Sequence, residues 1–228
     1  MKFGVVTFPG SNCDEDMIYV LESILDQKVE RLWHKDTDLK GVDFVILPGG
    51  FSYGDYLRSG AIAKLSPIMG EVIKHANNGG YVMGICNGFQ ILTESGLLEG
   101  ALLHNDNQKF ICKNIYLKPV SEGAAITKGL KDKAYKIPIA HGEGRYFASD
   151  ATIAKLHAND QVLFKYCDAE GTVGEENPNG STENIAGICN EGKNVFGMMP
   201  HPERAADEEL ANTDGKDMFL SILEYCQS

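Results

Sequence analysis

The sequence has little positive charge and no long apolar run. Its 228 residues include 21 Lys and Arg against 32 Asp and Glu, which gives a formal net charge of −11. Because phosphate groups repel so acidic a chain, we expect neither nucleic acid nor a membrane surface as a partner. The N-terminus lacks the apolar core of a signal peptide, and no stretch approaches the roughly 18 apolar residues of a membrane span. These absences predict a soluble, cytoplasmic protein.

The sequence also lacks paired cysteines. Its six cysteines lie far apart and none forms a CxxC motif. This spacing favours neither a zinc site nor a disulfide framework, and it is typical of proteins from a reducing compartment. Internal repeats, low-complexity tracts and linkers are absent as well. With 43% hydrophobic residues, the chain 1–228 is therefore predicted to form one domain.

Nucleotide-binding motifs are missing too. Residues 49–54 read GGFSYG, which is not the GxGxxG of dinucleotide sites. Residues 187–194 approach a P-loop, but Asn stands where Ser or Thr should hold magnesium, and no helical pattern follows. Since metal clusters and basic phosphate cradles are also absent, we expect no cofactor on this chain.

What the sequence does contain is a set of short apolar runs separated by helical patterns. Residues 2–8, 42–47 and 81–85 are apolar without strict alternation, which is typical of strands covered on both faces. Acidic residues open a helical pattern at 14–25, and Ser-Pro opens another near residue 67. The order predicts an α/β fold, a flavodoxin-like and mostly parallel sheet with helices on both faces.

One stretch carries a reactive side chain at a sharp turn. Residues 81–92 read YVMGICNGFQIL, an apolar strand that passes through GxCxG into a helical pattern. This is the pattern of a nucleophile elbow with Cys in place of Ser, and it makes Cys86 the candidate nucleophile. A helix N-terminus favours the reactive thiolate. Alternatively, Cys86 is a small buried residue and the glycines only serve a tight turn.

A base for this nucleophile is found near the other end of the chain. Residues 194–204 read NVFGMMPHPER, an apolar strand that ends at His201 and Glu203. Residues two apart in an extended chain point to the same side, so Glu203 can orient the imidazole of His201. A His at a strand end is often only hydrogen-bonded in place, and that alternative stays open.

A glycine-rich loop after the strand expected at residues 42–47 supplies candidate hydrogen-bond donors. Pro48-Gly49-Gly50 follows residues 42–47, and loops at the carboxyl ends of such strands line the binding crevice. We therefore expect the backbone N–H of Gly50 to join that of Asn87 in an oxyanion hole.

These motifs together resemble a known family. GxCxG with a distant His-x-Glu is shared by the class I (triad) glutamine amidotransferases. FPGSNCDEDM, LPGGFSYGDYLRSGAIA, IAHGEGRY and NPNGSTENIAGI are similar to the motifs of one branch, the glutaminase subunits of phosphoribosylformylglycinamidine synthase in purine biosynthesis. The resemblance extends from about residue 2 to residue 204.

The resemblance implies a reaction and its partners. Cys86 would attack glutamine and form a thioester, His201 oriented by Glu203 would move protons, and Gln90 would help to hold glutamine. The loop 141–145 would lie near the glutamine site or near the face that meets the partner. That partner would be an ATP-dependent synthase subunit, which carries ATP and magnesium and accepts the ammonia, with a small third subunit.

Two other classes of function stay open at this point. A stand-alone thiol hydrolase, such as a γ-glutamyl hydrolase, would use the same Cys86 and His201 but would be fully active without a partner. A binding module of flavodoxin-like fold would be non-catalytic. Glutaminase turnover, measured alone and with a synthase subunit, separates the three.

Overall fold

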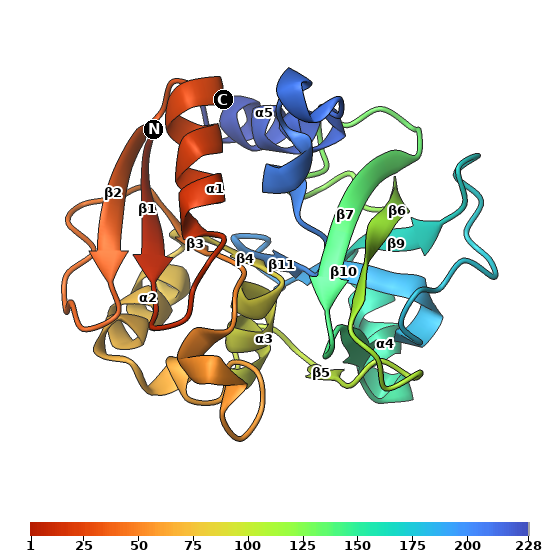
Figure 1. The fold of residues 1–228 in the computed structure, drawn as a ribbon, viewed down its shortest axis with the longest axis horizontal. Coiled ribbons are helices and arrows are strands. Elements are labelled where there is room, and N and C mark those ends of the chain that lie inside the picture. The colour runs from red at the N-terminus through yellow and green to blue at the C-terminus, as the bar shows by residue number, and fades with distance from the viewer. Residues whose placement is uncertain (228) are drawn as a thin grey trace. The chain divides into compact units, whose positions relative to one another are not determined.

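The computed structural model describes residues 1–227 and contains two compact units (Figure 1). The N-terminal unit comprises Met1–Leu98 together with Asn194–Gly197, and the C-terminal unit comprises Glu99–Lys193 together with the chain from Met198 onward. The chain leaves the N-terminal unit after Leu98, returns to it at Asn194 and then leaves it again.

The N-terminal unit is built on a parallel sheet. Its strands are β1 (Lys2–Thr7), β2 (Lys28–Trp33), β3 (Phe44–Leu47), β4 (Tyr81–Ile85) and β11 (Val195–Met198), in the order β2-β1-β3-β4-β11. Its helices are α1 (Asp14–Tyr19), α2 (Pro67–Asn77) and α3 (Asn87–Glu94), with a π-helical turn at Val20–Ile24 and 3-10 turns at Ser52–Asp55 and Ala63–Leu65.

Burial explains why these strands read as unbroken apolar runs. All four residues of β3 and the central four of β1 are buried, so both faces of the sheet are covered. β1 pairs in parallel with β2 and β3, and β3 pairs in parallel with β4. The order 2-1-3-4 is that of the flavodoxin-like fold, whose ligands bind beyond the carboxyl ends of the strands.

Loops from neighbouring strand ends are joined at that edge. Gly50 forms an isolated antiparallel bridge with Ser11, and the N–H of Phe51 donates to the carbonyl of Gly10 at 3.0 Å. The N–H of Cys13 donates to the carbonyl of Gly49 at 3.3 Å. The loop after β1 therefore supports the loop after β3 through backbone hydrogen bonds.

The C-terminal unit is built on antiparallel strands. They are β6 (Ile111–Pro119), β7 (Tyr135–His141), β9 (Val162–Cys167) and β10 (Ile185–Cys189), in the order β10-β9-β6-β7, with a separate pair formed by β5 (Ala101–Leu103) and β8 (Arg145–Phe147). The helices are α4 (Asp150–Ala158) and α5 (Asp214–Gln227), with 3-10 turns at Thr182–Asn184, Pro202–Ala205 and Glu208–Leu210.

β7 shows the alternation expected of such strands. Tyr135, Ile137, Ile139 and His141 are buried, while the residues between them are exposed or half-buried. A strand with one packed face and one wetter face is typical of antiparallel sheets. The buried face of β7 therefore ends at His141, which is the last residue of the strand.

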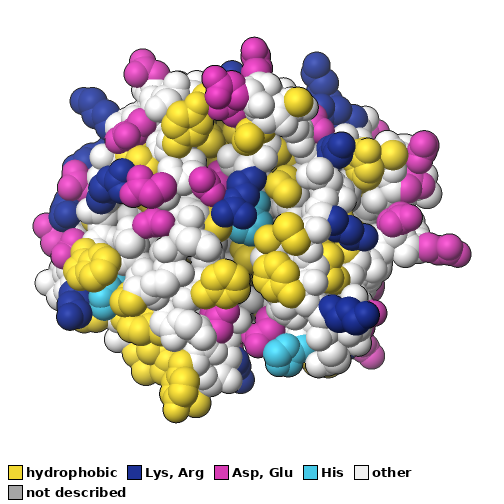
Figure 2. Space-filling model, in the orientation of Figure 1, with side chains coloured by type: hydrophobic (Ala, Val, Ile, Leu, Met, Phe, Trp, Pro, Cys, Tyr) yellow, Lys and Arg dark blue, Asp and Glu magenta, His cyan; other side chains and the backbone are white. Residues whose placement is uncertain are grey.

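The predicted α/β class is confirmed, with a parallel, flavodoxin-like sheet in the N-terminal unit. The antiparallel strands of the C-terminal unit add to that pattern. The prediction of one domain stays a prediction. Among residues 1–227, no helix combines the length and the apolar character needed to cross a membrane. Figure 2 shows acidic and basic side chains interspersed over the face toward the viewer.

Candidate active site

The turn between β4 and α3 holds Cys86 in a strained conformation. Cys86 is the N-terminal cap of α3, with φ 49° and ψ −105°, and its residue is only 5% exposed. Positive φ is costly for a residue with a Cβ and persists where the surrounding structure enforces it, often at functional sites. The backbone N–H groups of the first helical turn have no acceptor within the helix. The predicted nucleophile elbow is therefore present.

The two glycines of GxCxG are required by close packing. A Cβ on Gly88 would lie 1.9 Å from the carbonyl oxygen of Leu47, and a Cβ on Gly84 would lie 2.6 Å from the carbonyl carbon of Gly88. Both contacts are with backbone atoms, which cannot rotate away. The glycines thus allow α3 to start directly against β3 and β4, and this sets the position of Cys86.

We expect Gly88→Ala to destabilise the protein and to lower its activity, because α3 must move away from Leu47. Overpacking of this kind costs about 1–3 kcal/mol. Gly70 provides a matched control, because it also lies inside a helix but has open space around its Cβ position. Gly70→Ala should stabilise the protein by roughly 0.5–1 kcal/mol. Thermal unfolding of both variants checks this, and equal effects would contradict the packing argument.

The side chains of Asn87 and Gln90 hold the glycine-rich loop against α3. Asn87 is fully buried, and its Oδ1 accepts a hydrogen bond from the N–H of Ser52 at 3.0 Å. Its Nδ2 donates to Oε1 of Gln90 at 2.9 Å and to Oδ1 of Asp55 at 3.3 Å. The side chain of Asn87 is therefore a direct link between loop and elbow, and Gln90 is buried beside it.

Gly50 lies in the conformation that its predicted role requires. Its φ is +142°, and an added Cβ would come within 2.8 Å of Cα of Ser11. Only glycine adopts this backbone without strain at so close an approach. The oxyanion role of the N–H groups of Gly50 and Asn87 stays a prediction, but Gly50 lies in the loop after β3 and Asn87, at the start of α3, is hydrogen-bonded to the same loop.

The loop after Gly50 combines strained backbone with exposed apolar side chains. Positive φ values recur at Tyr53, Asp55 and Leu57. The hydroxyl of Tyr53 anchors the loop through contacts of 2.7 Å to Nδ1 of His34 and 2.8 Å to Oγ of Ser66. Phe51, Tyr56, Leu57 and Leu65 are 45%, 70%, 77% and 72% exposed. Hydrophobic side chains gather along the lower edge of the view in Figure 2. Such exposure is typical of a surface that contacts another protein.

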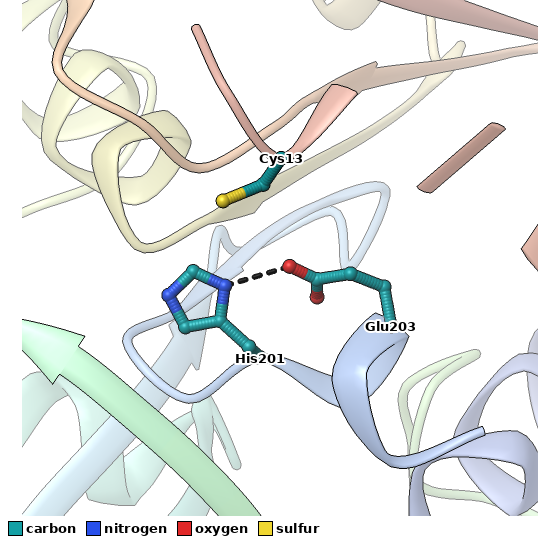
Figure 3. A group of neighbouring side chains, drawn as sticks. All are labelled: Cys13, His201 and Glu203. Carbon is teal, nitrogen blue, oxygen red and sulfur yellow. Dashed lines mark hydrogen bonds and ion pairs between the residues drawn. The ribbon is translucent and has the colours of Figure 1, made fainter. Parts of the chain in front are cut away.

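In the C-terminal unit, His201 and Glu203 form the predicted pair (Figure 3). Nδ1 of His201 lies 2.6 Å from Oε1 of Glu203, and both residues are 2% exposed. A buried carboxylate at this distance holds Nδ1 as the proton donor and leaves Nε2 to exchange protons with a reacting group. The predicted roles of general base and orienting residue require this arrangement, and they stay a prediction.

Packing fixes the loop that carries this pair. The N–H of His201 donates to the carbonyl of Pro138 on β7 at 2.9 Å. At the start of α5, a Cβ on Gly215 would lie 2.0 Å from the carbonyl oxygen of Pro202. α5 therefore packs directly on the backbone between His201 and Glu203, and the pair is held on both sides.

The sequence predicted six site residues, and the structure divides them between the units. Cys86, Asn87, Gln90 and Gly50 belong to the N-terminal unit, whereas His201 and Glu203 belong to the C-terminal unit. Sequence reasoning assigned no roles within the motifs HGEGR and NPNGS. The link between them through Asn179, and the contacts of the buried Asn105 with HGEGR, were missed, because nothing in the sequence spacing relates these residues to one another.

Comparison with protein families decides the class. A model of the CobB/CobQ-like glutamine amidotransferase domain matches residues 1–226. The chain belongs to this glutamine amidotransferase family. The resemblance found in the motifs is thereby confirmed, and so is the glutamine amidotransferase activity class.

Relatives of this amidotransferase carry a more specific description. The chain is 56% identical over 225 residues to the phosphoribosylformylglycinamidine synthase subunit PurQ of Koribacter versatilis, covering 98% of this chain and 97% of the relative. It is 56% identical over 222 residues to the PurQ subunit of Synechocystis, covering 96% and 99%. Each comparison therefore extends over nearly the whole of both chains.

Solved structures agree with the fold of the amidotransferase. A chain in the structure of PurLQS from Thermotoga maritima superposes with a TM-score of 0.88 at 44% identity, covering 99% of this chain and 98% of that chain. A glutamine amidotransferase from Thermotoga maritima superposes with a TM-score of 0.60 at 15% identity, covering 98% and 96%. The second likeness concerns the fold alone.

Proposed function

We propose that this chain is the glutaminase subunit of a phosphoribosylformylglycinamidine synthase and that it supplies ammonia for de novo purine biosynthesis. The observation that carries the proposal is the strained position of Cys86 at the start of α3, between two glycines that backbone packing requires. The PurQ relatives are named as subunits of this synthase, and their names support the reaction in which such a nucleophile would act.

In the first half of the reaction, the thiolate of Cys86 attacks the side-chain carboxamide carbon of glutamine. The N–H groups of Gly50 and Asn87 stabilise the oxyanion of the tetrahedral intermediate. Collapse of the intermediate breaks the bond between carbon and nitrogen, and His201 donates a proton to the departing nitrogen. Ammonia leaves, and a glutamyl thioester remains on Cys86.

In the second half, His201 acts as a general base, because it has just given its proton to the departing nitrogen. It removes a proton from water, which attacks the thioester, and collapse of the second tetrahedral intermediate releases glutamate and restores the thiolate of Cys86. Glu203 keeps the imidazole in one orientation through both halves, as its 2.6 Å contact with Nδ1 supports. The sum of the steps is glutamine and water giving glutamate and ammonia.

The proposal places the consumption of ammonia on another chain. The relative from Thermotoga maritima was solved in PurLQS, and we expect this chain to assemble likewise with a synthase subunit and a small third subunit. ATP and magnesium would belong to the synthase subunit. Assembly would occur in the cytoplasm, where purines are made. The exposed residues Phe51, Tyr56 and Leu57 provide an apolar surface on which such a partner can dock.

We expect the isolated chain to be a poor glutaminase that becomes active in the complex with acceptor substrate and nucleotide bound. The loop Pro48–Gly60 carries the Gly50 amide, and repeated positive φ values and exposed apolar side chains make its geometry dependent on what covers it. Docking would order the loop against Asn87. Part of the free energy of binding the partner would then serve to raise the turnover of glutamine. Losing one oxyanion donor typically lowers turnover about 100- to 1,000-fold. We therefore expect the complex to exceed the free chain in turnover by about that factor.

The measurement is glutamate release by the free chain and by the complex with both ligands. Leu57→Ser supplies a variant that weakens docking without touching Cys86, because this side chain is 77% exposed. Its glutaminase activity in the complex should approach that of the free chain at low synthase concentration and recover at high concentration. A free chain as fast as the complex would favour a stand-alone thiol hydrolase.

A further inference from the structure

The motifs HGEGR and NPNGS meet in a fully buried hydrogen-bond network in the C-terminal unit. Asn179 is 0% exposed, and its Nδ2 donates to the carbonyl of Gly144 at 2.8 Å and to the hydroxyl of Tyr166 at 3.3 Å. Its Oδ1 accepts from Oγ of Ser181 at 2.8 Å. The network fixes the loop that follows β7, and His141 stands at the start of that loop.

A second asparagine determines which nitrogen of His141 carries the proton. Asn105 is also 0% exposed, and its Nδ2 donates to the carbonyls of Lys109 at 2.8 Å and His141 at 2.9 Å. Its Oδ1 accepts the N–H of Gly144 at 3.1 Å, so the amide cannot be flipped. The same Oδ1 lies 3.1 Å from Nδ1 of His141. Nδ1 must therefore be protonated, and Nε2 carries a free lone pair.

Among residues 1–227, no donor reaches that lone pair. His141 is 3% exposed, and its Nε2 has no hydrogen-bond partner within residues 1–227. A buried acceptor without a partner is costly and calls for an explanation. The ring is also tightly confined, because a Cβ on Gly144 would lie 2.2 Å from it. Two buried asparagines and one glycine therefore hold the ring of His141 so that Nε2, an acceptor, has no donor among the described residues.

His201 is bonded through its backbone to the strand that carries His141. The N–H of His201 bonds to Pro138 of β7, three residues before His141. Burial, and after it the charge of His201, lower the pKa of His141 to about 4. His141 is therefore neutral at physiological pH and has no proton on Nε2 to give away.

We propose that Nε2 of His141 accepts a hydrogen bond from the ammonia released when the thioester forms. This inference rests on the proposed function, in which His201 protonates the departing nitrogen. The departing ammonia carries N–H donors that such an acceptor can bind, as the carboxamide of glutamine does before the bond between carbon and nitrogen breaks. A neutral acceptor binds ammonia without converting it to ammonium, which is not a nucleophile. His141 would thus hold ammonia in its reactive form before it passes to the synthase subunit.

The test uses two replacements that each keep one half of the imidazole. In His141→Asn, the amide can still donate to Asn105 as Nδ1 does, but the acceptor at the Nε2 position is lost. In His141→Gln, the longer side chain places an amide oxygen near the Nε2 position, but the donor to Asn105 is lost. The measured quantity is the amidated product formed per glutamate released by the complete complex.

Loss of one neutral hydrogen bond corresponds to about a two- to ten-fold change, so product per glutamate should fall by that factor in His141→Asn. It should lie closer to wild type in His141→Gln. A purely structural role predicts the reverse order, with His141→Asn closer to wild type in both this ratio and thermal stability, and that result would overturn the inference. A ratio that is unchanged in His141→Asn would overturn it as well.

Two further variants complete the design. His157 is half exposed on α4 and pairs with Glu183, so His157→Asn controls for loss of a histidine and should leave the ratio unchanged. Cys86→Ser tests the proposed function separately. If Cys86→Ser still releases glutamate, the proposed function fails. If Cys86→Ser is inactive and the His141 ratios follow the structural order, only the inference on ammonia fails.

Discussion

Cys86→Ser is expected to abolish glutamine-dependent synthesis by the assembled complex, with a loss of roughly 10⁴- to 10⁶-fold, as found when the nucleophile of a triad is removed. A serine hydroxyl at this position lacks the ionised form on which a thiol nucleophile depends. Synthesis driven by added ammonium salts should stay nearly intact, because the variant loses only the source of ammonia.

The measurement is product formation with glutamine and with ammonium salts, on the same preparation of the complex. Cys112→Ser is the matched control, since Cys112 is exposed on β6 and should not affect either rate. Cys167 and Cys189 offer no substitute nucleophile, because burial raises the pKa of their thiols to about 11 and about 12. If the ammonia-driven reaction also collapsed, Cys86 would serve assembly, and the division of labour between the chains would be wrong.

His201→Asn should lose nearly as much activity as Cys86→Ser. Glu203→Gln should lose less, and we expect its loss to be about 100-fold smaller than that of His201→Asn. Asparagine cannot shuttle a proton between the leaving nitrogen and water, so both halves of the reaction stop. Glutamine at position 203 can still accept the N–H of Nδ1, but it lacks the charge that stabilises the imidazolium. The 2.6 Å contact and the burial of both side chains make that charge effective.

Steady-state glutaminase kinetics on the two variants in the complex decide the question. Both positions are buried, so thermal unfolding must show that each variant remains folded. Near-normal turnover in His201→Asn would move the base to another histidine, with His141 the next candidate. A larger loss in Glu203→Gln than in His201→Asn would mean that Glu203 takes part in proton transfer itself.

The elbow could be predicted because its chemistry is local. A strand, two glycines and a helix within twelve residues leave few backbone paths, and the structure shows the reason in the 1.9 Å approach of a Gly88 Cβ to Leu47. His201 and Glu203 could also be paired because they are only two positions apart, but the predicted reason was wrong: Pro202–Ala205 forms a 3-10 turn and not an extended segment. Local geometry was therefore sufficient to predict the parts of the candidate site that each lie within one segment.

The antiparallel strands and the His141 network could not be predicted in this way. An apolar run shows that a strand is buried but does not give its direction, and β6 pairs with β7 only through contacts that the fold creates. Asn105 is one polar residue among several before β6, and three of its four side-chain hydrogen bonds exist only once Gly144 and His141 are in place. Non-local hydrogen bonds of this kind leave no pattern in the sequence.

The bond between Ser52 and Asn87 has a consequence for how loop movement can be timed. The Ser52 N–H is satisfied by a side chain of the nucleophile helix and not by the backbone of its own loop. Its amide proton can exchange with deuterium in the solvent only while the loop is away from Asn87. The exchange rate at this one position therefore reports how long the loop stays against Asn87, the arrangement that the predicted oxyanion site requires, and it can be measured without substrate and without turnover.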